Sequence, residues 1–161
     1  MSEKEDKQER LNRELIELLN ELRVVLPGVQ VLFAFLLTVP FTNRFQRITD
    51  TQEQVFFGTF ILTLLATGLL IAPSAYHRLR WRQHDKEQIL TTANRQAITG
   101  MGLLALALSG AVYLVTDLIF ASGAAVSLVT AATLAYLFWF WFGLPLLRRI
   151  RDPDDSPFKK R

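Results

Sequence analysis

The sequence predicts an all-α protein, an integral membrane four-helix bundle, and the first observation behind this prediction is a segregated composition. The chain is 50% hydrophobic and 20% charged. Asp, Glu, Lys and Arg are nevertheless absent from four blocks, residues 24–43, 54–77, 96–116 and 118–147. A helix over each block is long enough to cross about 30 Å of hydrocarbon. Because these blocks largely lack the polar face of a soluble helix, we expect four transmembrane spans.

The second observation is the alternating placement of the basic residues. Of the 18 Lys and Arg residues, only Arg44 and Arg47 lie in the loops that join span one to span two and span three to span four. The others lie before the first span, in the loop 76–96 or after the fourth span. Since basic residues mark the cytoplasmic side, we expect a multi-pass protein of the plasma (inner) membrane with both termini in the cytoplasm.

Composition also limits the partners and the chemistry. The net charge of +3 comes from basic residues that adjoin the spans. We therefore expect the lipid bilayer, and anionic lipid at its cytoplasmic face, as partners, and no nucleic acid. The absence of Cys excludes disulfides, thiolate metal sites and a Cys nucleophile. With no HExxH motif, phosphate-binding loop or nucleophile elbow, we expect no enzyme, no cofactor and no metal site.

Residues 1–26 predict a cytoplasmic amphipathic helix ahead of the first span. Its apolar residues recur at spacings of four, three, four and three, in a heptad-like seam formed by Leu11, Leu15, Leu18, Leu22 and Val25. Pro27 and Gly28 follow, and they predict a break or bend of the helix at the membrane surface.

The remaining elements form a membrane domain over residues 27–147. Its spans are predicted at about 27–42, 54–73, 97–119 and 125–147. Asp50-x-x-Glu53 is a start signal for the second helix. The third helix should begin near Lys86, so that about three of its turns extend into the cytoplasm. A short external turn at residues 121–124 should precede the fourth helix, which is expected to end near Leu147 before a basic tail over 148–161.

Polar residues within the first two spans are the main functional candidates. Gln30 and Thr38 share a face of the first span with Ala34, and Thr59, Thr63 and Thr67 form a stripe on the second. One interpretation is helix–helix contact through hydrogen bonds, and Thr also returns its hydroxyl bond to its own helix. The other is a polar seam between the two helices that lines a pathway.

Two further sets lie in the second half of the chain. Tyr113, Thr116 and Asp117 cluster at the outer end of the third span, where Asp117 is either an ion or proton site at an external mouth or a hydrated interfacial carboxylate. A stripe of small residues follows the fourth span at every fourth position, formed by Gly123, Ser127, Ala131 and Ala135. Such a stripe lets another span of the chain, or a second copy, approach closely, and we expect a homo-oligomer.

Three stretches of the sequence carry a family resemblance. They are RLNRELIELLNELRVVLPGVQVLFAFLLTVPF (10–41), LLIAPSAYHRLRWR (69–82) and DKEQILTTANR (85–95). The chain resembles a family of small four-span membrane proteins of unknown function found in actinobacteria, some of which are labelled sodium:proton antiporters. The resemblance implies the four-span fold. Antiport normally needs a titratable group deep in the bilayer, and no span carries one in its middle.

Two functions are therefore open. The first is an oligomeric cation channel or transporter whose route is lined by the polar faces of the first two spans. The second is a membrane scaffold or regulatory subunit that binds a cytoplasmic partner or anionic lipid. We favour the first slightly, because several polar faces within a bundle are easier to explain if water or ions enter it.

Overall fold

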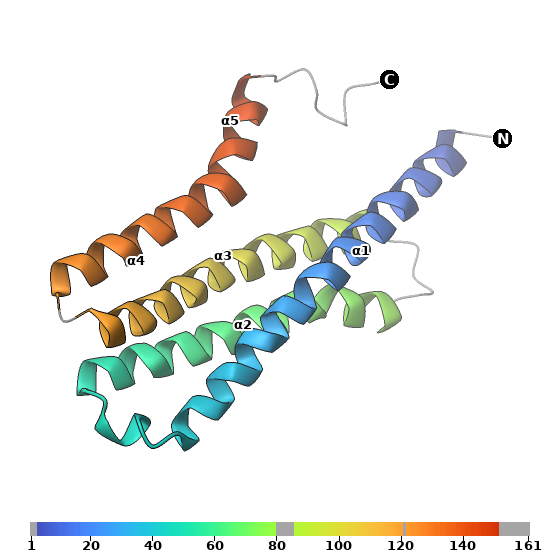
Figure 1. Ribbon diagram of the computed structural model, residues 1–161. Coiled ribbons are helices and arrows are strands. Elements are labelled where there is room, and N and C mark those ends of the chain that lie inside the picture. Colours follow the sequence, from blue (N-terminus) through green and yellow to red (C-terminus); the bar gives the residue numbers. More distant parts are fainter. Residues whose placement is uncertain (1–2, 80–85, 121, 152–161) are drawn as a thin grey trace. The chain divides into compact units, whose positions relative to one another are not determined.

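The computed structural model describes residues 3–79, 86–120 and 122–151, and within these ranges the chain is helical without a strand. Its long helices are α1 (Glu3–Thr38), α2 (Asp50–Leu79), α3 (Lys86–Ile119) and α4 (Gly123–Phe138) (Figure 1). Four stretches are long and apolar enough to cross a membrane, namely Glu9–Phe41, Asp50–Ala75, Glu87–Ile119 and Gly123–Arg148. The prediction of an all-α protein with four candidate spans is confirmed for the residues that the structure describes.

The chain divides into two compact units. Unit 1 is Met1–Ala107 and contains α1, α2 and the first part of α3. Unit 2 is Leu108–Arg161 and contains the last part of α3 together with α4 and the helical segments after it. The division falls inside α3, so one continuous helix contributes to both units.

Helix α1 is continuous through Pro27. Of the break or bend that the sequence predicts at this residue, the break is wrong and the bend stays a prediction. Its buried residues recur at every seventh position, at Leu15, Leu22, Val29 and Leu36. The seam that the sequence predicts for the N-terminal half therefore runs on into the apolar half. A proline in a helix costs about 3 kcal/mol, and packing on both sides of Pro27 offsets this cost. Pro27 itself is exposed, so its ring does not disturb the buried seam.

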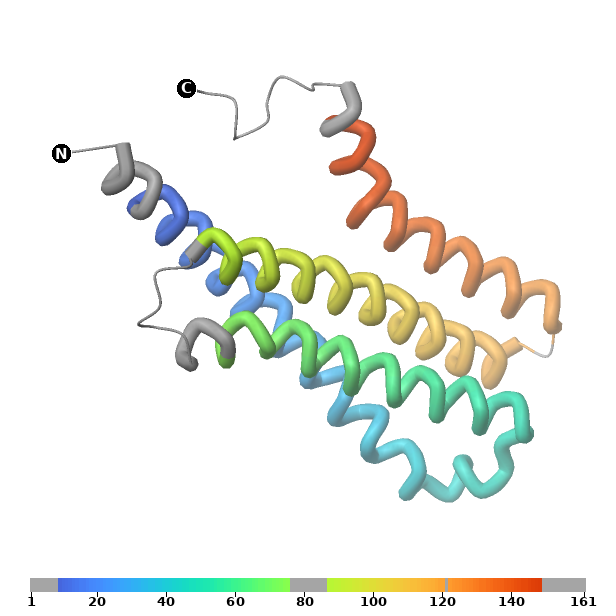
Figure 2. The backbone as a smooth tube through the Cα atoms, turned by 180° about the vertical axis from the view of Figure 1, so that it is seen from behind, coloured from blue at the N-terminus to red at the C-terminus, as the bar shows by residue number. Residues whose placement is uncertain are grey.

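Helix α2 contacts α1, and its buried positions follow a related period. Its buried positions alternate at spacings of three and four residues, at Phe56, Thr59, Thr63, Ala66, Leu70 and Pro73. A period of 3.5 residues is typical of helices that pack side by side along their length. The rings of Phe33 in α1 and Phe60 in α2 stack with their centroids 5.3 Å apart. Figure 2 shows the chain turning back through the short connection into α2, which crosses α1.

The connection between α1 and α2 contains two 3-10 turns, η1 (Val39–Phe41) and η2 (Phe45–Arg47). Helix α2 begins at Asp50, as the sequence predicts, but the capping pair lies one residue earlier than Asp50 and Glu53. The Thr49 backbone N–H donates to Gln52 Oε1 at 3.0 Å, and the Gln52 N–H donates to Thr49 Oγ1 at 3.3 Å. This is a capping box built with Thr and Gln.

Helix α3 begins at Lys86, as the sequence predicts, and continues without interruption to Ile119. The extension of its first turns into the cytoplasm stays a prediction. Within unit 1 its buried face contains the small residues Ala93, Ala97 and Gly100, which lie between the buried Ile89 and Leu104. A Cβ atom added at Gly100 would lie 2.9 Å from Leu70 Cγ and 3.3 Å from Leu69 Cβ. Gly100 therefore allows α3 to approach α2 closely.

In unit 2, α4 continues through a π-helical turn, η3 (Trp139–Gly143), into α5 (Leu144–Arg151). The helix thus extends past the predicted end near Leu147. The Leu144 N–H bonds to the Trp139 carbonyl, five residues back. Pro145 has no N–H and its ring would clash with the carbonyl four residues back, so the wider turn accommodates it. The tail over 152–161 lies outside the described residues.

Candidate functional site

The threonine stripe of α2 lies in the packed interior of unit 1. Thr59 and Thr63 are buried and Thr67 is half-buried. The Thr63 hydroxyl donates to the Thr59 carbonyl at 2.8 Å, and the Thr67 hydroxyl donates to the Thr63 carbonyl at 2.7 Å. These hydroxyl protons are bound within their own helix, which allows the two side chains to pack without a further partner. Their role in a pathway stays a prediction.

Gln30 and Thr38 lie on a different surface. Both residues, and Ala34 between them, are exposed on α1, away from the buried seam that contains Val29 and Leu36. The Thr38 hydroxyl donates to the Phe35 carbonyl at 2.7 Å. Because Thr59 and Thr63 are buried, one chain does not bring the two polar sets together into a seam between α1 and α2.

The polar cluster at the end of α3 belongs to unit 2. Thr116 is buried, whereas Tyr113 and Asp117 are half-buried. Asp117 lies two residues before the last residue of α3, so its carboxylate stands near the end of the third candidate span. This position suits a carboxylate in the headgroup region. Its role as an ion or proton site stays a prediction.

The small-residue stripe of α4 is exposed along its length. Gly123, Ser127, Ala131 and Ala135 all lie on the outer surface of unit 2. The buried side of this helix is instead marked by Val126, which is 2% exposed. The stripe is therefore not used to pack α4 within its own unit.

Two features of α3 and α4 were not predicted from the sequence. The first is the small-residue face of α3, from Ala93 to Gly100, which packs inside unit 1. The spacings of four and three residues between Ala93, Ala97 and Gly100 are visible in the sequence and could have predicted this face. The second is a pair of buried polar atoms, Gln96 Oε1 and Thr130 Oγ1, for which the described residues provide no hydrogen-bond partner.

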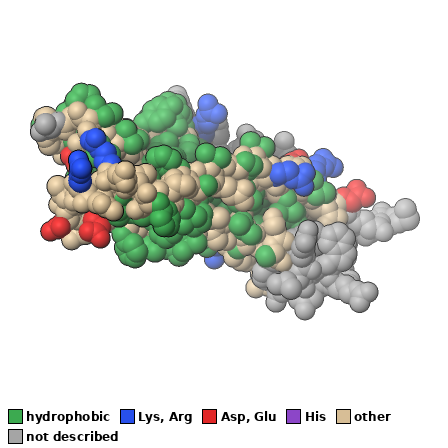
Figure 3. Space-filling view, turned by 60° about the horizontal axis from the view of Figure 1, so that its bottom comes forward, with side chains coloured by type: hydrophobic (Ala, Val, Ile, Leu, Met, Phe, Trp, Pro, Cys, Tyr) green, Lys and Arg blue, Asp and Glu red, His purple; other side chains and the backbone are tan. Residues whose placement is uncertain are grey.

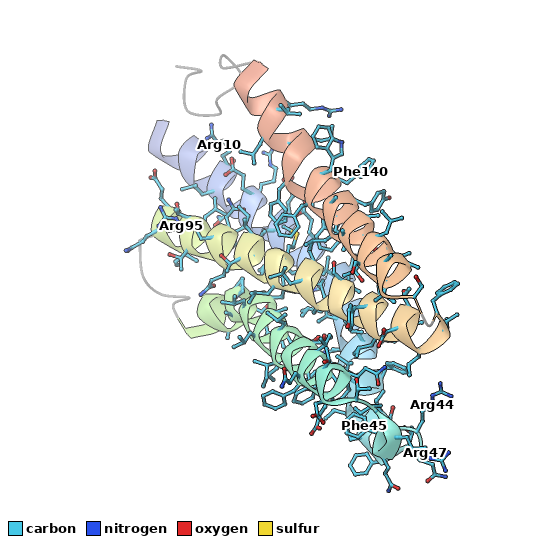
Figure 4. The ribbon with its side chains drawn as sticks, turned by 90° about the vertical axis from the view of Figure 1, so that its left-hand side faces the viewer. Arg10, Arg44, Phe45, Arg47, Arg95 and Phe140 are labelled. Carbon is cyan, nitrogen blue, oxygen red and sulfur yellow. The ribbon has the colours of Figure 1, made fainter. Side chains whose placement is uncertain are left out.

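Charged groups are kept out of the packed interior. The buried polar side chains of the described residues are the hydroxyl groups of Thr59, Thr63, Ser109 and Thr116. Figure 4 shows Arg44 and Arg47 at the end of unit 1 opposite Arg10 and Arg95.

Among the described residues, no group of three or more His, Cys, Asp or Glu side chains could hold a metal ion.

The outer surface is strongly apolar, as the face drawn in Figure 3 shows. Large exposed side chains occur on several helices, among them Val31 (71% exposed) in α1, Phe57 (63%) in α2 and Leu128 (71%) in α4. A protein surrounded by water rarely exposes so much continuous apolar surface, whereas acyl chains cover it without cost. This surface agrees with a protein embedded in a membrane.

The four apolar helices and the apolar surface together indicate a helical protein of the membrane-embedded class. A family model matches residues 4–145, nearly the whole chain, and the chain belongs to this family, which is described as a family of unknown function (DUF6328). No curated protein and no solved structure matches the chain.

Proposed function

We propose that this protein is a scaffold or regulatory subunit of the plasma (inner) membrane, with both termini cytoplasmic, and that the N-terminal half of α1 binds a cytoplasmic protein. The proposal rests on the way in which α1 packs along both of its halves. One buried seam, from Leu15 to Leu36, ties the N-terminal half of the helix to its apolar half. A partner bound near the N-terminus would thus be held by the same rigid helix that enters the membrane.

The surface of this N-terminal half suits a protein partner. Ile16 and Val24 are 59% and 79% exposed, and Asn20 lies between them at helical spacing. From Glu9 to Val24 the chain carries four Glu and three Arg residues. Such balanced charge gives little attraction to anionic lipid, which basic helices bind. Exposed apolar residues framed by mixed charges are typical of helices that dock on other proteins.

A photo-crosslinking amino acid at Asn20 tests this proposal in living cells. We expect one discrete crosslinked product that contains a second, different protein. The double variant Ile16→Ser/Val24→Ser should abolish this product, because it removes the exposed apolar contacts. Leu128→Ser is the matched control, since Leu128 is also exposed but lies on α4. A product that persists in the double variant would contradict the proposed surface.

The second candidate, an oligomeric cation channel or transporter, is favoured by the exposed position of Gln30 and Thr38. With the hydroxyls of Thr63 and Thr67 bound within α2, a polar route would have to run between copies of the chain. Purified protein in liposomes separates the two proposals: a cation flux that Gln30→Leu alters would support transport and contradict a purely scaffolding role.

A further inference from the structure

We propose that the Gln30–Ala34–Thr38 face of α1 is the contact surface for a second copy of this chain within the membrane. These residues follow one another at every fourth position and are all exposed. They lie away from the buried seam of Val29 and Leu36, so α1 packs within its own unit through one side and presents these residues outward. The inference goes beyond the proposed function and does not depend on the cytoplasmic partner.

The depth of Gln30 makes contact with lipid alone unfavourable. The apolar half of α1 enters the hydrocarbon after Pro27, and Gln30 lies three residues beyond it, which is about 5 Å along a helix. The carboxamide of Gln30 is therefore expected inside the hydrocarbon layer. Hydrocarbon offers no hydrogen-bond partner, and an unpaired amide there costs several kcal/mol, roughly 2–7.

Thr38 and Gln30, the two polar residues of this face, differ in the hydrogen-bond partners that they require. Thr38 donates its hydroxyl to the Phe35 carbonyl of its own helix at 2.7 Å, so lipid can surround it at little cost. A Gln carboxamide offers two donors and an acceptor. In a regular helix the nearby backbone groups are already bonded, and a neighbouring chain is the natural partner for the amide.

A second copy is the partner that the chemistry of Gln30 selects. An amide is self-complementary, since each group can donate to and accept from an identical one. Copies inserted in the same orientation and related by a two-fold axis along the membrane normal place their Gln30 residues at the same depth. Ala34, one turn further along, is small enough for the two backbones to approach.

The charge on α1 limits this contact to the apolar half. Arg23 lies on the same side of the helix, one heptad before Gln30, and two such guanidinium groups repel one another at short range. The contact is therefore expected to begin after Pro27, where the helices enter the hydrocarbon. The small-residue stripe of α4 does not require a hydrogen-bond partner from another chain, because its one polar residue, Ser127, can bond to its own helix.

Single-cysteine crosslinking tests the surface without background, since the chain has no native Cys. Ala34→Cys lies on the proposed face. Phe35→Cys is the matched control, because Phe35 is also exposed and at nearly the same depth but is rotated by about 100° around the helix. Ala131→Cys samples the α4 stripe. Each variant is oxidised in lipid vesicles at high dilution in lipid, and the disulfide-linked dimer is quantified.

We expect a dimer from Ala34→Cys that forms much faster than from Phe35→Cys. Adding Gln30→Leu should weaken dimerisation by about threefold to tenfold, the range for one interhelical hydrogen bond, and Gln30→Asn should retain part of it. Equal crosslinking of Ala34→Cys and Phe35→Cys would indicate random collision and overturn the inference. Rapid crosslinking of Ala131→Cys with none from Ala34→Cys would move the contact to α4 and equally overturn it.

Discussion

At the scale of single residues, polar side chains in this bundle divide by whether their own helix can satisfy them. The hydroxyl groups of Thr63 and Thr67 in α2 and of Thr133 in α4 each bond to a carbonyl one turn back, whereas that of Thr130 has no partner among the described residues. Residues bonded to their own helix can be buried or face lipid without a further partner. A carboxamide has more groups to satisfy, which is why Gln30 is the residue on which the dimer proposal rests.

Small residues act at the same scale by setting how closely two helices approach. We expect Gly100→Ala to destabilise the protein by about 1–3 kcal/mol, because the new Cβ would collide with the buried Leu70 and overpack the contact. Gly68→Ala is the matched control: a Cβ there meets nothing within 4 Å, and alanine favours the helix by about 1 kcal/mol over glycine. Denaturant titration in detergent micelles measures both. Equal stability of the two variants would mean that α3 and α2 do not meet at Gly100.

At the scale of helices, the main finding is that packing overrides a local signal. Proline at position 27 predicts a break, but the buried residues on either side of it, Leu22 and Val29, keep one register. The opposite case is the π-helical turn η3, where Pro145 changes the local hydrogen bonding although the helix continues. A helix can therefore continue past a proline either as an α-helix or through a π-helical turn, and the packing around the proline decides which occurs.

The unbroken seam of α1 makes a prediction about its N-terminal half. Leu22→Ala should cost about 2–4 kcal/mol of unfolding free energy, because Leu22 is 4% exposed and its truncation leaves a cavity. Val24→Ala, two residues away, should cost less than about 1 kcal/mol, since Val24 is 79% exposed. Thermal unfolding of the purified variants gives both values. Similar small losses would show that this half of α1 does not pack in the bundle.

At the scale of the whole molecule, orientation in the membrane is predicted from charge. An even number of crossings would place both chain ends on one side of a bilayer, and the concentration of basic residues near those ends predicts that this side is cytoplasmic. Arg44 and Arg47, which are predicted to lie on the other side, belong to the short connection between α1 and α2.

Cysteine labelling in intact cells tests this orientation. A membrane-impermeant maleimide should label Asn43→Cys from outside, because Asn43 lies exposed in the connection between α1 and α2. Glu9→Cys and Arg148→Cys should react only after the membrane is permeabilised. Labelling of Glu9→Cys and Arg148→Cys from opposite sides would exclude an even number of spans. Labelling of both in intact cells would reverse the predicted orientation.

Much of the architecture was predictable because it depends on local composition. The lengths of the uncharged blocks predicted four candidate spans, and the periodic seam from Leu11 to Val25 includes Leu15 and Leu22, which are buried in α1. The extension of α3 from Lys86 was likewise visible in the sequence. Local signals failed where two of them competed, as at Thr49 and Asp50, where either residue is a good helix cap.

The candidate site was less predictable, because a helical pattern does not say which face meets another helix. The sequence by itself determined that α1 carries Gln30 and Thr38 on one face and that α2 carries a threonine stripe. Only the tertiary structure decided that the stripe is packed inside while Gln30 faces outward. In lipid, both sides of a span are apolar, so hydrophobicity cannot mark the inner one. The inner face is chosen by fit between helices, as Gly100 shows against Leu70.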